Sequence, residues 1–226
     1  MVAGRRVGAV RSMNSVKTTR HSGSRRQQAL LPVTIGVMVL CLAYYLLFFV
    51  AGANFREVVS GRVYRSAQPS PGQLRQWMRR YGIRTVINLR GDAGQITEDE
   101  RAVADELGVE MIAISLSANR IPPKDRRAQL IRAIETAEQP ILIHCAHGVD
   151  RAGTASALAA MAIGKMDYEK AKWHAYVPPG PWKRKQGSNY VHISDMLRLY
   201  ESFCKRNGLD TNSWHQLKQW IIDADI

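Results

Sequence analysis

Cys145 and Arg151 are the residues of this sequence best suited to chemistry, and both belong to one stretch, HCAHGVDR. A cysteine thiolate is a strong nucleophile, and arginine presents a planar fork of N–H donors that matches two phosphate oxygens. Only five residues separate the two, so a single loop can hold both around one anion. The pair predicts attack of the thiolate on a phosphate monoester, giving a phosphocysteine that water then cleaves.

The segments on either side of this stretch are the elements that must position it. The short apolar run that begins at Ile141, after Pro140, predicts a buried strand, and the small residues from Ala152 to Ala162 predict a helix. A loop between a strand and a helix directs its backbone N–H groups and the helix N-terminus at one spot, which favours an anion and a thiolate. We expect these N–H groups to come from Ala146, His147, Gly148, Val149 and Asp150.

Three loop residues have further expected roles. Gly148 permits a backbone conformation that other residues resist. His144 is expected to orient the loop through a ring hydrogen bond rather than to transfer a proton. His147 either tunes the charge of the pocket or is simply exposed.

The stretch HCAHGVDRAG resembles the His-Cys-(x)5-Arg signature of cysteine-dependent protein tyrosine and dual-specificity phosphatases. Upstream, RVYRSAQPSPGQLRQWMRRYGIRTVINLRGD is similar to the front half of the bacterial dual-specificity-like members. The resemblance covers roughly residues 60 to 165. It implies that Cys145 is the nucleophile, that Arg151 binds the phosphoryl oxygens, and that the substrate is a phosphorylated protein or a phospholipid.

The general acid is less clear from the sequence. Many of these phosphatases carry it upstream of the cysteine, but the matching region, Ser115 to Ile121, contains no carboxylate. Asp150 is the leading candidate, because the loop resembles that of myotubularin-type and some bacterial lipid phosphatases, which keep the acid in the loop itself. Asp125, in the first turn of an expected helix, and Asp92, in the RGD turn, are the alternatives. If Asp150 is not the general acid, its expected role is only to pair with an arginine or to cap the helix.

Ala152 stands where these phosphatases usually carry Ser or Thr, whose hydroxyl helps the thiolate leave in the second step, although the phosphatases of regenerating liver also carry Ala there. One missing hydrogen bond to a charged group is worth roughly 1.5–3 kcal/mol, or about ten- to a hundredfold in rate. We expect slow hydrolysis of the phosphocysteine unless Thr154 substitutes. A phosphate-binding pseudophosphatase is therefore an alternative function, and a rhodanese-like sulfurtransferase or an arsenate reductase is a weaker one.

Strand and helix patterns alternate through the middle of the chain and predict an α/β fold, a central and mostly parallel sheet flanked by helices. Such sheets bind ligands at the carboxyl ends of their strands, where the HCAHGVDR loop would lie. We expect a short strand followed by a turn within 63–71, strands at 85–89 and 110–116, and a strand that begins at 141. We expect helices at 73–81, 97–107, 124–137, 152–162, 167–176, 188–205 and 211–223.

The first fifty residues differ in composition from the rest. Residues 1–29 carry seven basic residues and no acidic one, which is typical of a disordered arm. Residues 30–50 form an uncharged apolar run, long enough for a transmembrane helix, for which about 20 residues suffice. The basic arm would remain cytoplasmic, which leaves the catalytic domain, residues 54–226, in the periplasm or otherwise outside the cytoplasm. Cleavage after Ala53 as a signal peptide is the alternative.

The charge distribution and the cysteine content argue against other classes of protein. Net charge is +13, but the basic residues beyond the arm are scattered without an aromatic-interleaved stripe, so we expect no nucleic-acid partner. The three cysteines, Cys41, Cys145 and Cys204, form no disulfide framework, and no Cys/His spacing suggests zinc. We therefore expect neither a metal nor a cofactor. Cys204 is expected to be a buried core residue, with a resolving thiol for Cys145 as the alternative.

Overall fold

A computed structural model describes residues 23–46, 53–176 and 192–226 and divides the chain into two compact units, 1–44 and 45–226. The first unit contains α1 (Gly23–Tyr45), whose apolar side chains from Val33 to Leu42 are largely exposed. Among the residues that the structure describes, no helix has the length and apolar character needed to cross a membrane. The expected span, 30–50, runs beyond this described part, which stops at residue 46 and resumes at residue 53.

The second unit is built on a five-stranded sheet with the order β1-β2-β5-β3-β4. The β1–β2 pair is antiparallel, whereas β2, β5, β3 and β4 run parallel to one another. This confirms the expected mostly parallel sheet and places β5, which leads into the HCAHGVDR loop, at its centre. The strands are β1 (Arg56–Val59), β2 (Val63–Ser66), β3 (Thr85–Asn88), β4 (Glu110–Ala113) and β5 (Ile141–His144).

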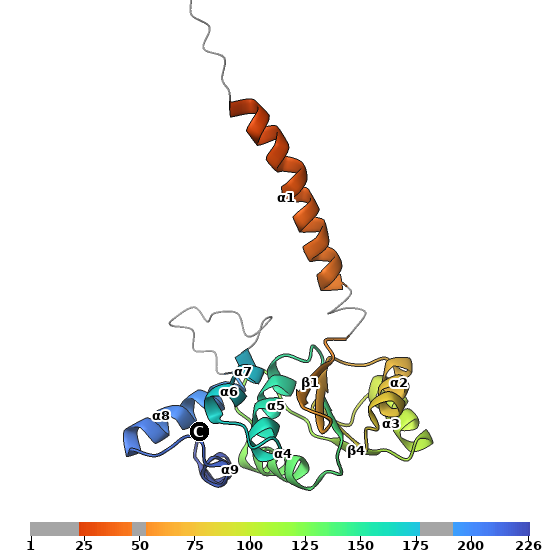
Figure 1. The fold of residues 1–226 in the computed structure, drawn as a ribbon. Helices are drawn as coiled ribbons and strands as arrows, with labels where there is room; N and C mark the ends of the chain where they lie inside the picture. The colour runs from red at the N-terminus through yellow and green to blue at the C-terminus, as the bar shows by residue number, and fades with distance from the viewer. Residues whose placement is uncertain (1–22, 47–52, 177–191) are drawn as a thin grey trace, which may run out of the picture. The chain divides into compact units, whose positions relative to one another are not determined.

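Helices cover both faces of the sheet (Figure 1). One apolar core lies between the sheet and α2 and α3, and a larger one lies between the sheet and α4, α5 and the C-terminal helices. The helices are α2 (Pro71–Tyr81), α3 (Gln95–Glu106), α4 (Lys124–Thr136), α5 (Asp150–Ala162), α6 (Tyr168–Ala171), α7 (Trp173–Tyr176), α8 (Asp195–Asn207) and α9 (Trp214–Asp223).

The small residues of α5 allow close packing against its neighbours. Its residues from Ala152 to Ala162 are all buried, because the helix is enclosed by the sheet, α4, α6 and α7. At Gly153, an added Cβ would lie 2.8 Å from the carbonyl oxygen of His174 in α7. The chain therefore holds the start of α5, and with it the reactive loop, firmly against its neighbours.

Three sequence expectations are corrected. The strand β1 was not predicted, because its sequence REVV mixes charged and apolar residues, as edge strands often do. The helix expected at 167–176 is divided into α6 and α7 at Lys172. The helix expected at 188–205 begins at Asp195, and its first expected residues, 188–191, lie outside the described residues.

Candidate active site

Cys145 lies directly after β5 and is 2% exposed. Side chains alternate between the faces of a strand, so Cys145 shares a face with Ile143 and joins the core beneath α4 and α5. The sulfur is therefore held in a defined place at the carboxyl edge of the central strand. Cys145 is a free thiol, as nucleophilic attack requires.

The loop after Cys145 is oriented by hydrogen bonds to its carbonyl groups. The amide of Asn54 donates to the carbonyl oxygens of His147, at 3.1 Å, and Gly148, at 3.3 Å. The backbone N–H of Gln68 donates to the carbonyl of Ala146, at 3.3 Å. In a trans peptide the C=O and the following N–H point in opposite directions. Because three successive carbonyls are bound on one side, the N–H groups of residues 147–149 point to the other, an arrangement compatible with the anion cradle expected from the sequence.

Gly148 is the residue on which this close packing depends. Its φ of +67° lies in the left-handed region, and an added Cβ would come within 2.5 Å of the backbone of Ser66 and Ala67. Both the backbone conformation and the approach to the end of β2 therefore require glycine here, as the sequence analysis expected.

Arg151 opens α5 and is anchored at the same edge of the sheet. Its Nη1 donates to the carbonyl oxygens of Leu116, at 3.2 Å, and Leu89, at 3.4 Å. These two carbonyls lie just beyond β4 and β3, respectively. Neutral carbonyls fix the direction of the guanidinium without neutralising it, so its charge remains available to an anion in the cradle.

Behind the loop, on the α3 side of the sheet, lies a buried polar cluster that the sequence analysis missed. Glu100 of α3 is 1% exposed and accepts hydrogen bonds from the amides of Gln68 and of Asn88, the latter at 3.0 Å. Its Oε1 lies 3.4 Å from Nε2 of His144, which is fully buried. Glu100 thus ties together the ends of β2, β3 and β5, the three strands that surround Cys145.

The two titratable groups of this cluster have strongly altered pKa values. Burial raises the pKa of Glu100 to about 7, against smaller lowering effects of the Gln68 hydrogen bond and the charge of Arg90. Burial, with the charges of Arg90 and Arg151, lowers the pKa of His144 to about 3. His144 therefore stays neutral near pH 7, and neither of its ring nitrogens makes a hydrogen bond to a described residue, so the orienting role expected for it stays a prediction.

Asp150 forms an ion pair that no local pattern predicted. Its Oδ1 lies 3.1 Å from Nε2 of His192, which belongs to the turn before α8. The backbone N–H of Ser194 donates to Nδ1 of His192, so a neutral ring carries its proton on Nε2, facing Asp150. The hydrogen bond to His192 lowers the pKa of Asp150, helped by the charges of His192, Arg151 and His147 and opposed by burial.

The other two carboxylates considered as general acids are bound elsewhere. Asp92 is exposed and pairs with Arg101 of α3. Asp125 is exposed at the start of α4, with its Oδ2 3.5 Å from Nε of Arg126. Of the three candidates, Asp150 is the one that the structure brings into the reactive loop.

Thr154 and Cys204 both have partners within the helical part of the fold. The Thr154 hydroxyl donates to the carbonyl of Asp150 within α5, at 2.9 Å. Cys204 is a free, buried thiol of α8 that accepts a hydrogen bond from Gln216 of α9, at 3.3 Å. This arrangement fits the core role expected for Cys204.

A cysteine at the base of an N–H cradle, followed by an arginine that opens the next helix, is the arrangement of the cysteine-dependent phosphatases. Residues 51–175 match the family described as DSP-PTPase phosphatase fused to NAD+ kinase. This match covers just over half of the chain, and the protein belongs to that family.

Two relatives illustrate the similarity. The dual specificity protein phosphatase TpbA of Pseudomonas aeruginosa strain UCBPP-PA14 is 27% identical over 115 residues, which are 50% of this chain and 49% of TpbA. The chain thus spans about half the length of the curated relatives it matches. A crystal structure of P. aeruginosa TpbA shares the fold, with a TM-score of 0.50 and 20% identity over 76% of this chain and 93% of that chain. The core catalytic domain of the PP-IP phosphatase Siw14 from S. cerevisiae gives a TM-score of 0.49 with 17% identity, covering 69% and 93% of the two chains.

Proposed function

We propose that this protein is a phosphatase that hydrolyses phosphate monoesters through a phosphocysteine on Cys145. The observation that carries the proposal is the set of bound carbonyls in the loop, which leaves the N–H groups of residues 147–149 free of these partners and able to bind an anion beside Cys145 and Arg151. The name of its relative TpbA, a dual specificity protein phosphatase, supports phosphorylated Tyr, Ser or Thr as substrate, with a lipid phosphate as the alternative.

The reaction has two steps. In the first, the Cys145 sulfur attacks phosphorus, the P–O bond to the leaving group breaks, and the leaving oxygen takes a proton. In the second, water attacks phosphorus, the P–S bond breaks, and phosphate leaves as the thiolate is restored. The cradle and Arg151 bind the phosphoryl oxygens throughout and stabilise the charge that they gain in each transition state.

Asp150 is assigned the proton transfers, as the leaving-group acid and then as the base for water. An aspartate is already ionised near neutral pH, and the contact with His192 lowers the pKa of Asp150 further, which suits the base in the second step better than the acid in the first. We therefore propose that the enzyme favours aryl phosphates such as phosphotyrosine, because a phenolate leaves with little help from a proton.

The test is turnover of aryl and alkyl phosphates by the full chain, with Cys145→Ser and Asp150→Asn beside the wild type. We expect no turnover from Cys145→Ser, and from Asp150→Asn a larger loss on alkyl than on aryl phosphates. Turnover retained by Cys145→Ser would refute the mechanism. Phosphate binding without turnover in the wild type would instead identify a pseudophosphatase.

We also propose that residues 30–50 anchor the protein in a membrane, with the basic arm in the cytoplasm and the catalytic domain outside it. The support is the uncharged apolar run after an arm with seven basic residues, together with the exposed apolar side chains of α1. A reporter fused to the C-terminus tests the topology: signal from a reporter active only in the cytoplasm would contradict the proposal. The mass of the mature chain tests for cleavage after Ala53.

A further inference from the structure

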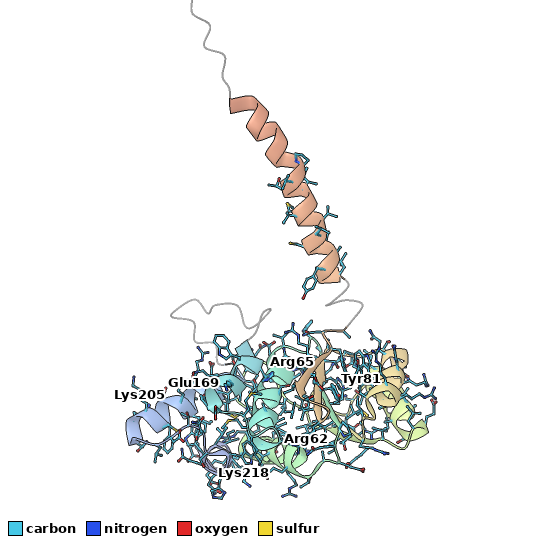
Figure 2. The ribbon with its side chains drawn as sticks, viewed as in Figure 1. Arg62, Arg65, Tyr81, Glu169, Lys205 and Lys218 are labelled. Carbon is cyan, nitrogen blue, oxygen red and sulfur yellow. The ribbon has the colours of Figure 1, made fainter. Side chains whose placement is uncertain are left out.

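Arg65 is a buried cation without a carboxylate partner in the described part of the chain. It belongs to β2, is 3% exposed, and donates from Nη1 to the carbonyl oxygen of His174 in α7. Its Nε makes no hydrogen bond to any described residue. Figure 2 labels Arg65 and also Arg62, which lies just before the other end of the same strand.

The sheet register places Arg65 beside Cys145. Arg65 pairs with Ile143 across the parallel β2–β5 ladder, so both side chains lie on the α5 face of the sheet. Cys145 is two residues further along and continues the same face. An added Cβ on Gly153, in the first turns of α5, would lie 3.5 Å from Nη1 of Arg65, so the guanidinium lies against the start of α5.

Burying a charge without a partner of opposite sign is costly, commonly by several kcal/mol. The surroundings of Arg65 disfavour its charged form, since burial and the charge of Arg56 lower its pKa to about 10. The negative charge of the Cys145 thiolate opposes that effect.

We propose that Arg65 is the buried counter-cation of the Cys145 thiolate, a positioning residue that acts from behind the phosphate cradle. It favours the thiolate in the free enzyme. It also favours the second step, in which the P–S bond breaks and its electron pair returns to the sulfur. This role offsets part of the loss caused by Ala152, which brings no hydroxyl to the departing sulfur. The inference rests on the proposed function in so far as Cys145 reacts as a thiolate.

The test is alkylation of Cys145 by iodoacetamide, a neutral reagent, in the full chain across a range of pH, read at the Cys145 peptide by mass spectrometry. Glutathione added to the same reaction serves as the reference thiol. The variants are Arg65→Met, Arg65→Gln and Arg65→Lys. The matched control is Arg62→Met, which also removes an arginine that donates to a backbone carbonyl, that of Ile163, at 3.0 Å.

An opposite charge a few ångströms away stabilises an ion enough to change its population about tenfold or more. We expect alkylation near neutral pH to fall about tenfold in Arg65→Met and Arg65→Gln, and to match the wild type at high pH, where every thiol is ionised. Arg65→Lys should stay within a few fold of the wild type, and Arg62→Met should not differ from it. The remaining charged groups around the pair, Arg56, Arg151, His147 and His174, are unchanged in all variants.

Equal alkylation profiles for Arg65→Met and Arg62→Met would overturn the proposal. Failure of both neutral variants to fold would overturn it as well, because Arg65 would then be needed for structure rather than for the thiolate. Gln keeps a donor for the His174 carbonyl, so loss of that hydrogen bond alone cannot explain its result. Alkylation requires no turnover, so an inactive wild type would refute the proposed function without deciding this test.

Discussion

Replacement of Glu100 by Gln should change how the stability of the protein depends on pH. Glu100 is buried behind the reactive loop, where its pKa is raised to about 7 from the ordinary 4.5. The folded protein therefore holds a proton on this side chain from about pH 4.5 to pH 7, where the unfolded chain has already lost it. The contribution of Glu100 to the free energy of unfolding is therefore fully present at low pH, and it is lost as the pH rises from about 4.5 to 7.

The magnitude follows from the two pKa values. Between pH 5 and pH 8, ionisation of the buried carboxyl should cost the wild type about 2.5 kcal/mol of unfolding free energy that Glu100→Gln does not lose. Gln cannot accept both hydrogen bonds that Glu100 receives, so the variant should also carry a loss of about 1 kcal/mol at every pH. The neighbouring His144 and its lowered pKa are common to both proteins, and their contribution cancels in the comparison.

The assay is urea unfolding of the wild type and Glu100→Gln at several pH values between about 5 and 8. Glu98→Gln is the matched control, since it removes an exposed carboxylate from the first turn of the same helix. We expect the wild type to lose stability relative to Glu100→Gln as the pH rises, and Glu98→Gln to run parallel to the wild type. Parallel curves for Glu100→Gln and the wild type would refute the raised pKa and the placement of Glu100.

Three further predictions concern the loop. Ala152→Ser should restore a hydroxyl to the departing thiolate and raise the steady-state rate about ten- to a hundredfold, and it should remove the initial burst that we expect in stopped-flow traces of the wild type. An unchanged rate would show that the second step is not limiting. His192→Asn should raise the pKa of Asp150 and speed alkyl phosphate hydrolysis more than aryl, whereas a matched change of the exposed His215 should do neither. Gly148→Ala should destabilise the fold by about 2 kcal/mol or more and should lower kcat/KM. The reason is that φ at this position is positive and the added Cβ would meet the backbone of Ser66. A fully active variant with an unchanged Tm would contradict the loop geometry.

The reactive loop could be predicted from the sequence because its determinants are local. An apolar run, a loop with glycine and a small-residue helix occupy consecutive positions, and each has a physical preference that acts over a few residues. The same holds for the parallel sheet, whose strands are short and rich in apolar residues. The pairing of Asp150 with His192 had no comparable signal, since 42 positions separate the two in the chain.

The supporting residues were missed because they act over long distances in the sequence. Asn54 holds the carbonyls of His147 and Gly148 from 93 and 94 positions away. Glu100 lies on the buried side of an otherwise ordinary amphipathic helix, where its charge alone suggests exposure. Arg65 likewise resembles a surface residue until the register of β2 against β5 places it beside Cys145. Such residues become visible only once the strands are paired and the helices packed.

The most direct test of the mechanism is to identify the phosphorylated residue during turnover. The full chain is mixed with an aryl phosphate, quenched in acid within the first turnover, digested and examined by mass spectrometry. The mechanism predicts a phosphoryl group on the Cys145 peptide, formed in a burst close to one per protein and absent from Cys145→Ser. A phosphoryl group on another residue, or turnover of Cys145→Ser at the wild-type rate, would contradict it.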